Sequence, residues 1–413
     1  MVARIAAVLA LLASPAFAEA LPVFSDTGPD AAAFGAAEGY PAGTRATLSQ
    51  QRHMVGAYSH YDQVLTSRPV ARAAAASPFG RAESELALTY THLGQPHTLA
   101  DYLDRHPTTG LLIERDGTIL YEHYRYARTD RDRFTSQSMA KTVLAMLVGI
   151  AVAEGKIRSI DDSASIYVPE LAGTQLGRTP IRALLHMASG IAFTEVYNGR
   201  DDMARLAHGL FRPGNAGAAT VLSQFDTRVA EPGTVWHYAG LNSELLGLVL
   251  TNATRMQIAD YLATRIWQRI GTEADASWVV DATGQEVAYC CFNATLRDWA
   301  RFGMLLAQDG AWGGAQVIPR QWVLDATTVP ADSFLAPGKT GRTRGYGYQV
   351  WIQPGPRRQF ALIGVHGQTI LIDPAARLVL VHTAVRPKAA GDPMSAELVS
   401  LWNALVAQEA PSP

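Results

Sequence analysis

Strand-forming segments stand near both ends of this 413-residue chain, and helical patterns fill the region between them. Early in the chain, residues 111–125 (LLIERDGTILYEHYR) contain two β-prone runs joined at Asp116-Gly117, a pair preferred in two-residue hairpin turns. Four strand-like segments come late, at 346–353, 360–364, 369–372 and 378–385. This order predicts an α+β fold: an antiparallel sheet flanked by helices, with strands from both ends of the chain and an inserted all-helical subdomain at about 146–282.

Apolar residues at helical spacing predict the helices that surround this sheet. They are expected at 99–105, 181–187, 203–211, 242–251, 258–270, 296–308 and 394–409. Residues 19–105 otherwise show no clear periodicity, although they are rich in Ala, Gly, Pro and aromatic residues. We therefore expect an irregular N-terminal segment over 19–105 that wraps around a main domain at 106–413.

The first 18 residues have the pattern of a secretory signal peptide. Arg4 supplies the positive start, Ile5–Ala13 the short apolar core, and Ala16-Phe17-Ala18 a small-residue cleavage site. No later run reaches the roughly 18 apolar residues of a membrane helix. We expect cleavage after Ala18 and a periplasmic or secreted protein without a membrane span.

Charge and cysteine content narrow the possible partners. A net charge of −2 gives no electrostatic reason to expect nucleic acid as a partner. The sequence has no Cys/His cluster with zinc spacing, so neither a metal nor another cofactor is expected. The two cysteines, Cys290 and Cys291, are adjacent, and two half-buried thiols beside Phe292 are favoured over a vicinal disulfide.

One segment carries the chemistry of a nucleophile. In Ser138-Met139-Ala140-Lys141, a helix that starts near Ser138 places Ser138 and Lys141 on one face, one turn apart. The helix N-terminus favours developing negative charge near the Ser138 hydroxyl. The apolar run 143–153 can bury Lys141 and depress its pKa, so that the amine can accept the serine proton. A capping serine with a surface lysine is the alternative, but with four lysines in the chain about 0.2 chance Ser-x-x-Lys matches are expected.

Further motifs reveal a resemblance to a known family. Residues 231–247 (EPGTVWHYAGLNSELLG), 184–190 (LLHMASG) and 293–303 (NATLRDWARFG) resemble motifs of the serine β-lactamase-like hydrolases. That family includes class C β-lactamases, DD-peptidases, carboxylesterases and 6-aminohexanoate-dimer hydrolases. The resemblance extends over most of the mature chain, and the spacing of about a hundred residues from Ser138 to Tyr238 agrees with it. No Gly-x-Ser-x-Gly elbow is present, which argues against an α/β-hydrolase.

The resemblance implies roles for residues of the second motif. It implies that Tyr238 lies against the nucleophile and Lys141 and passes a proton to the leaving group. A tyrosine between two cations can lose or share its proton well below its solution pKa of about 10, which fits this role. Gly240 stands where the family often has the asparagine that grips the side-chain amide of a β-lactam. This difference weakens the expectation of activity on antibiotics.

A third motif has two candidates. Lys339-Thr340-Gly341 spells the Lys-Thr-Gly triad of penicillin-recognising enzymes, but it lies in a Gly- and Arg-rich loop. Residues 362–364 have the expected strand context, and Gly364 ends that segment. The resemblance then implies that the N–H groups of Ser138 and Val365 form the oxyanion hole. His366 either touches the substrate or packs.

A second tyrosine is suggested next to the site. Tyr197 follows the 184–190 motif at the place where the resemblance to dimer hydrolases implies a contact with the scissile amide nitrogen. A surface aromatic residue is the alternative. The neighbouring Asp201-Asp202 pair is expected to be solvated loop charge, although one carboxylate could meet a substrate amine.

Together these features predict a secreted serine hydrolase that cleaves a small-molecule ester or amide through an acyl-enzyme. The 6-aminohexanoate-dimer hydrolase and carboxylesterase branch gives the best resemblance. Two alternatives remain open. One is a β-lactamase or D-amino-acid peptidase that uses Lys339, and the other is a non-catalytic ligand-binding member of the fold.

Overall fold

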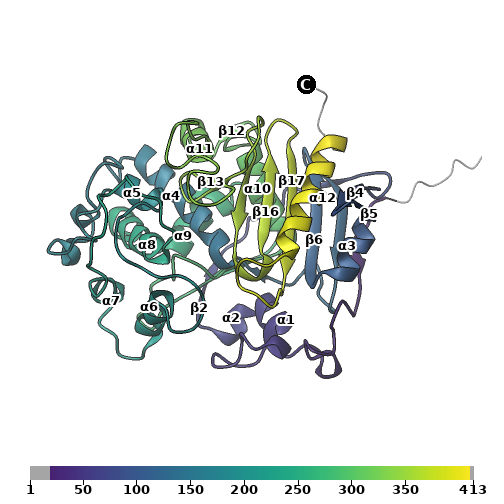
Figure 1. The fold of residues 1–413 in the computed structure, drawn as a ribbon, viewed down its shortest axis with the longest axis horizontal. Helices are drawn as coiled ribbons and strands as arrows, with labels where there is room; N and C mark the ends of the chain where they lie inside the picture. The colour runs from purple at the N-terminus through teal and green to yellow at the C-terminus, as the bar shows by residue number, and fades with distance from the viewer. Residues whose placement is uncertain (1–18, 410–413) are drawn as a thin grey trace, which may run out of the picture.

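The computed structural model describes residues 19–409, and the expected signal peptide at 1–18 lies outside them. A nine-stranded sheet forms the centre of the fold (Figure 1). The order along the sheet is β1-β7-β6-β17-β16-β15-β14-β13, and β3 also pairs with β7. The central strands are β6 (Thr108–Arg115), β7 (Thr118–Tyr124), β15 (Phe360–Ile363), β16 (Thr369–Asp373) and β17 (Leu378–Ala384).

The centre of this sheet is antiparallel and combines strands from both ends of the chain. β6 pairs with β7 on one side and with β17 on the other, and β17, β16 and β15 follow in antiparallel order. The β6–β7 turn uses Asp116 at φ 49° and Gly117 at φ 83°, the left-handed values that a type I′ turn requires. The predicted fold class and early hairpin are therefore confirmed.

The segment predicted as one strand at 346–353 is instead a tight hairpin. Its two strands are β13 (Gly345–Tyr346) and β14 (Trp351–Ile352). Gly347 approaches the backbone so closely that an added Cβ would lie 1.9 Å from the Ala326 carbonyl oxygen. Gln349, at φ 56°, completes the reversal. The strand prediction was wrong here because the chain turns where it contacts the end of α11 (Arg320–Thr327).

The N-terminal segment is more ordered than predicted. The helix predicted at 99–105 is confirmed as α3 (Leu99–Arg105), but β1 (Val23–Phe24) and β3 (Gly80–Arg81) also pair with β7 as parallel strands. A second sheet has the order β2-β9-β10-β8, and a separate hairpin joins β4 to β5. The further elements are β2 (Ser67–Val70), β4 (Thr89–His92), β5 (Gln95–Thr98), β8 (Phe134–Thr135), β9 (Ala276–Val279), β10 (Phe292–Ala294), α1 (Gln51–Ser59) and α2 (Tyr61–Val64).

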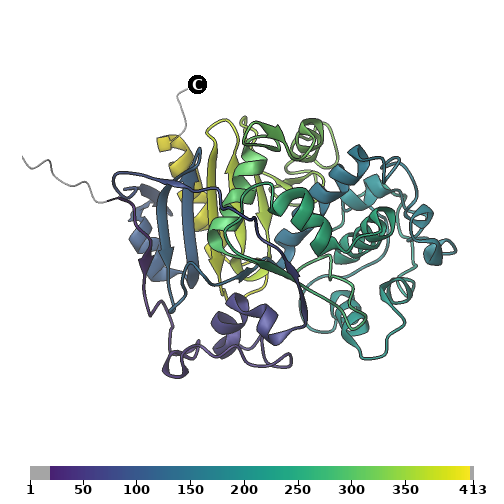
Figure 2. The same ribbon diagram turned by 180° about the vertical axis from the view of Figure 1, so that it is seen from behind.

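Alternating side chains give the main sheet two buried faces. Leu111, Ile113, Leu378 and Leu380 pack on one face with α3 and α12 (Met394–Glu409). The intervening residues, such as Leu112 and Val379, pack on the opposite face, where α10 (Leu296–Ala307) lies. Figures 1 and 2 show α12 and α10 on opposite sides of the sheet.

The helices between the two groups of strands lie beside the sheet (Figure 1). α4 (Ala140–Ala153) is buried along almost its whole length and packs on α8 (Gly240–Thr254). The helix predicted at 258–270 begins as α9 (Ile258–Leu262) and continues as a short π-helix at Ala263–Trp267. The other elements are α5 (Ile181–Leu185), α6 (Asp202–Phe211), α7 (Ala218–Leu222), β11 (Ala311–Trp312) and β12 (Ala315–Gln316). Within residues 19–409, none of the helices has the length and apolar character needed to cross a membrane.

Candidate active site

A turn between β8 and α4 presents Ser138. Ser136 pairs with Phe292 of β10 through its N–H, which donates to the Phe292 carbonyl oxygen at 2.7 Å. Gln137 then adopts φ 44°, a left-handed value that non-glycine residues rarely take and that often accompanies functional sites. Ser138 follows in a short 3-10 turn, Gln137–Met139, that leads into α4. Its side chain is only partly buried, so the hydroxyl is available to a ligand.

Lys141 lies next to the Ser138 hydroxyl. Its Nζ is 2.9 Å from Ser138 Oγ and donates to the Tyr289 carbonyl oxygen at 2.7 Å. The residue is 1% exposed, and burial lowers the pKa of the ammonium to about 8, although the carboxylates of Glu195 and Glu244 oppose this shift. An amine with this pKa is partly unprotonated near neutral pH and can accept a proton from Ser138.

Tyr238 closes the other side of Lys141. Its ring centroid is 5.2 Å from Lys141 Nζ, and its ring stacks on Trp351 at 5.6 Å. Burial raises the pKa of the phenol above its ordinary value, and the Glu195 charge raises it further; the contacts with Ser138 and Arg342 oppose this only in part. The low phenol pKa that two neighbouring cations could produce is not found, because burial exceeds their effect. Tyr238 therefore keeps its proton and can donate it.

Glu195 connects the second tyrosine to the start of α8. It accepts hydrogen bonds from the Tyr197 hydroxyl and from the Gly240 N–H, both at 2.6 Å. A Cβ added at Gly240 would lie 3.3 Å from Glu195 Oε2, so glycine at this position leaves room for the carboxylate. The sequence analysis missed Glu195, and its place two residues before Tyr197 was the only available signal.

Asp201 holds the Tyr197 loop in place. Its carboxylate accepts hydrogen bonds from the N–H groups of Val196 and Tyr197, and from the Ala204 N–H at the start of α6. The residue is 7% exposed. The interpretation of Asp201 as solvated loop charge was therefore wrong, because its buried carboxylate is the acceptor for three backbone N–H groups, one of them at the start of a helix.

The end of β15 lies against the nucleophile turn. A Cβ added at Gly364 would lie 2.4 Å from the Ser136 carbonyl oxygen and 3.0 Å from the Ser138 nitrogen. This close approach brings Val365, the next residue, to the edge of the site. His366 follows at φ 60°; its Nδ1 donates to the Arg386 carbonyl oxygen at 2.7 Å, and its ring packs edge-on against Tyr58.

The Lys339-Thr340-Gly341 triad lies in a turn, with Lys339 exposed. The Thr340 hydroxyl donates to the Arg344 carbonyl oxygen at 2.8 Å. Arg342, in the same loop, places its guanidinium 5.7 Å from the Trp236 ring centroid and 5.9 Å from that of Trp351. Arg342 is exposed and makes no salt bridge within residues 19–409. The sequence analysis missed it, although the loop was recognised as Arg-rich.

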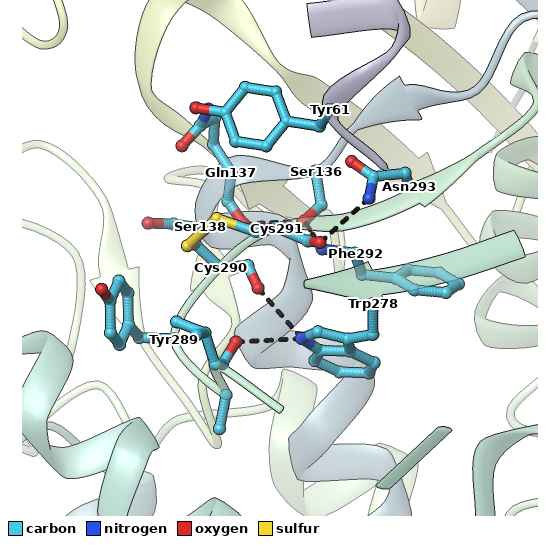
Figure 3. Close-up of a disulfide and its surroundings, with 12 residues drawn as sticks. Tyr61, Ser136, Gln137, Ser138, Trp278, Tyr289, Cys290, Cys291, Phe292 and Asn293 are labelled. Carbon is cyan, nitrogen blue, oxygen red and sulfur yellow. Dashed lines mark hydrogen bonds between the residues drawn. A yellow bond between two sulfur atoms is a disulfide. The ribbon is translucent and has the colours of Figure 1, made fainter. Parts of the chain in front are cut away.

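The two cysteines form a disulfide next to this site (Figure 3). The preference for two thiols was therefore wrong. Cys290 and Cys291 follow Tyr289, whose carbonyl oxygen holds Lys141, and precede Phe292, whose N–H donates to Ser136 Oγ at 3.0 Å. A local sequence cannot reveal this pairing, because it depends on the contacts that hold residues 289 and 292.

Comparison with known proteins identifies the family of this chain. The Beta-lactamase family matches residues 97–399 of the chain. A curated relative, the 6-aminohexanoate-dimer hydrolase of Paenarthrobacter ureafaciens, is 26% identical over 362 residues, which cover 86% of this chain and 90% of that protein.

Solved structures share the fold. A Bacillus anthracis protein provisionally described as a 6-aminohexanoate-dimer hydrolase superposes with a TM-score of 0.79 at 24% identity, covering 88% of this chain and 97% of that one. A family VIII carboxylesterase superposes with a TM-score of 0.55 at 18% identity, covering 73% and 93%. The family match spans most of the chain and includes every residue of the site described above. This chain belongs to the beta-lactamase family, and it is a hydrolase of that fold.

Proposed function

We propose that the chain is an exported serine hydrolase that cleaves a linear amide or ester through an acyl-enzyme on Ser138. The observation that carries this proposal is the 2.9 Å distance between Ser138 Oγ and the Nζ of Lys141, a buried amine whose pKa is lowered to about 8. A serine beside an unprotonated amine is an activated nucleophile.

Acylation begins as Lys141 Nζ takes the Ser138 proton while Oγ forms a bond to the substrate carbonyl carbon. The carbonyl π electrons move to the oxygen, which becomes an oxyanion. The N–H groups of Ser138 and Val365 stabilise this charge, and the contact between Gly364 and the Ser138 nitrogen supports their joint action. Each such donor contributes on the order of a hundredfold or more to the rate.

Collapse of the tetrahedral intermediate breaks the bond to the leaving group. Tyr238, which keeps its proton because burial raises the phenol pKa, donates that proton to the leaving nitrogen or oxygen. The Lys141 ammonium then returns a proton to Tyr238. A water molecule repeats the sequence on the acyl-enzyme, with Lys141 as base, and releases the acid and free Ser138.

The substrate class follows from the side of the site that Tyr238 occupies. Four aromatic rings (Trp236, Tyr238, Tyr346 and Trp351) pack together there, and Arg342 lies over two of them. This surface suits a leaving group with an extended apolar stem and a terminal carboxylate. The curated relative named for 6-aminohexanoate dimers supports a linear amide of this kind, and Gly240 argues against a β-lactam.

Replacing Arg342 with glutamine is expected to raise KM about tenfold for a linear ω-amino-acid dimer, since a charge-assisted hydrogen bond contributes about 1.5 kcal/mol. KM for the same dimer with an amidated terminal carboxyl should not change. Arg269→Gln is the matched control, because Arg269 is exposed and, like Arg342, makes no salt bridge within residues 19–409. Equal KM increases for both substrates would show that Arg342 does not bind the carboxylate.

The nucleophile is tested by trapping the acyl-enzyme. Rapid acid quench during turnover of a short-chain p-nitrophenyl ester should give an adduct of the acyl mass on the peptide that contains Ser138, and Ser138→Ala should give neither adduct nor turnover. An adduct on another residue, or equal turnover by both proteins, would refute the mechanism. Binding of the dimer without any adduct or turnover would favour a non-catalytic member of the fold.

The same assay separates the hydrolase subgroups. A chromogenic cephalosporin and the linear dimer are run beside the ester. Cephalosporin hydrolysis that is lost in Lys339→Ala would favour a β-lactamase or D-amino-acid peptidase instead. We expect hydrolysis of the ester and the dimer, with no effect of Lys339→Ala.

Export is proposed from the signal-peptide pattern of residues 1–18. The Cys290–Cys291 disulfide supports it, because disulfides persist in oxidising compartments. Expression of the full chain in a bacterium, followed by fractionation and N-terminal sequencing, should find a periplasmic or extracellular protein that begins at Glu19.

A further inference from the structure

The Cys290–Cys291 disulfide lies within the segment that carries the hydrogen-bond acceptor for Lys141. On one side of it, the Tyr289 carbonyl oxygen accepts from Lys141 Nζ at 2.7 Å. On the other side, Phe292 pairs with Ser136 through both its N–H and its carbonyl oxygen. Ser136 stands two residues before the nucleophile. In Figure 3 the two sulfur atoms lie on the Ser138 side of this segment, and the Phe292 ring points the other way, towards Trp278.

The carbonyl groups of the two cysteines are held by other elements. The Cys290 carbonyl oxygen accepts from Trp278 Nε1 at 3.0 Å. The Cys291 carbonyl oxygen accepts from Asn293 Nδ2 and from the Val279 N–H, both at 3.1 Å. Both carbonyls are therefore committed to groups of β9 and β10. The carbonyl group left to meet Lys141 is that of Tyr289, and its direction depends on the backbone of the next two residues.

That backbone has an unusual conformation. Cys291 adopts φ 70°, in the left-handed region that residues with a β-carbon rarely adopt. The bond between the two sulfur atoms closes a small ring that contains the Cys290–Cys291 peptide group. This ring restricts the dihedral angles of both residues and keeps Cys291 in the left-handed region.

We propose that the Cys290–Cys291 disulfide is a positioning element for Lys141, and that reducing it lowers the hydrolytic rate. The proposal rests on the proposed role of Lys141 as the base. Neither cysteine is assigned a contact with the reacting atoms. Their role is to fix the direction of the Tyr289 carbonyl, which in turn holds Nζ at the Ser138 hydroxyl.

Reduction consumes two electrons and two protons. One molecule of a dithiol such as dithiothreitol supplies both and becomes a cyclic disulfide, while the sulfur–sulfur bond of the protein breaks and two thiols form. Opening the ring lets Cys291 leave the left-handed region. The peptide groups between Tyr289 and Phe292 then reorient, and Lys141 loses its carbonyl acceptor.

Loss of that acceptor shifts the pKa of Lys141 in a direction that can be measured. A carbonyl oxygen that accepts from an ammonium stabilises the protonated form, so its loss lowers the pKa of Lys141 further. The other groups that face Nζ are the carboxyl groups of Glu195 and Glu244 and the rings of Tyr238 and Tyr289. The reduced enzyme should therefore have a lower kcat and an acidic limb of its pH–rate profile at lower pH.

The first experiment compares oxidised and reduced wild-type enzyme. The protein is incubated with dithiothreitol, and two new thiols per chain are counted after acid quench. The kcat for a p-nitrophenyl ester is then measured from pH 5 to pH 10. We expect kcat of the reduced enzyme to be lower by on the order of tenfold or more, because small displacements of a catalytic group lower the rate strongly. Reoxidation should restore both kcat and the pH profile.

Two double variants isolate the backbone effect. Cys290→Ala/Cys291→Ala lacks the disulfide and keeps a β-carbon at 291, so it should behave like the reduced enzyme. Cys290→Ala/Cys291→Gly also lacks the disulfide, but glycine adopts positive φ without a steric penalty. This variant should keep a kcat near that of the oxidised wild type and should not respond to dithiothreitol. The two variants differ by one methyl group, and their thermal unfolding is recorded beside the kinetics.

Each other outcome refutes the proposal. Unchanged kcat and pH profile in both the reduced wild type and the Ala/Ala variant would show that the disulfide does not position Lys141. A loss of kcat with an unchanged pH profile would mean a general structural role. A change in kcat of the Ala/Gly variant on addition of dithiothreitol would show that the reagent acts on a group other than this disulfide. Any of these results, together with an acyl adduct on Ser138, would leave the proposed function intact; absence of that adduct would refute the function itself.

Discussion

Replacing Lys141 with methionine is expected to lower kcat/KM by about ten-thousand-fold or more, because members of a nucleophile–base pair act as a unit. Methionine fills the same buried space without a group that can accept the Ser138 proton. In the wild type, kcat should fall as pH drops through about 8, since protonation removes the base. The residual activity of Lys141→Met should lack this dependence. A pH–rate profile of both proteins with the p-nitrophenyl ester measures the effect.

The same substitution is expected to stabilise the folded protein at pH 7. The folded state lowers the Lys141 pKa from 10.5 to about 8, so the unfolded chain binds more protons between these values and stability rises with pH across that window. At pH 7 this difference costs the folded state about 3 kcal/mol. Methionine removes this cost of burying an ammonium group. The loss of the hydrogen bonds from Lys141 to Ser138 and Tyr289 offsets part of the gain in stability. A higher midpoint of urea unfolding would confirm that inactivity does not come from misfolding; full activity would refute the role of Lys141.

Replacing Gly364 with alanine is expected to lower kcat by about a hundredfold or more, the cost of losing one oxyanion donor. The added methyl group would lie 2.4 Å from the Ser136 carbonyl oxygen and 3.0 Å from the Ser138 nitrogen, so these backbone groups must move apart. The separation moves the Val365 N–H away from the Ser138 N–H. Because the oxyanion forms only in the reaction, KM should change little.

Gly173→Ala is the matched control. A Cβ at Gly173 meets nothing within 4 Å, and like Gly364 its backbone lies outside the left-handed region. Its kcat should equal that of the wild type. Overpacking at Gly364 is also expected to cost about 1–3 kcal/mol of unfolding free energy, so urea unfolding is measured for both variants. Wild-type kcat in Gly364→Ala would contradict the assignment of Val365 to the oxyanion hole.

Local patterns predicted most of the main sheet and its helices. The Asp116-Gly117 turn needs two left-handed residues in succession, and this requirement is visible in the sequence. The consecutive apolar residues of β6 and β17, which are buried on both faces of the sheet, and the 3.6-residue period of α10 are equally local. The turn at Gly347 and the parallel pairing of β1 and β3 were missed, because they depend on contacts with residues far away in sequence.

In the candidate site, too, some contacts follow from local sequence and others depend on residues far away in sequence. Ser138 and Lys141 are three residues apart on one helical turn, so their contact could be expected from sequence. Glu195 and Arg342 reach Tyr238 only through tertiary folding, and their local signals, a position two residues before Tyr197 and an Arg-rich loop, did not identify them as neighbours of Tyr238. The pKa of Tyr238 depends on burial, which the sequence does not report. Here burial outweighed the cations and raised the pKa.

The pairing of β6 with β17 has a consequence for biosynthesis. The contact between Thr108 and His382 joins residues 274 positions apart, so the central sheet cannot close until nearly the whole chain has left the ribosome. The loop-closure entropy of such a contact is lost before the packing of the sheet compensates for it, which makes folding slow. β15, whose end completes the nucleophile turn, is also made late. We therefore expect the sheet and the active site to be completed only after synthesis, so that the export proposed above would act on a chain that is not yet active.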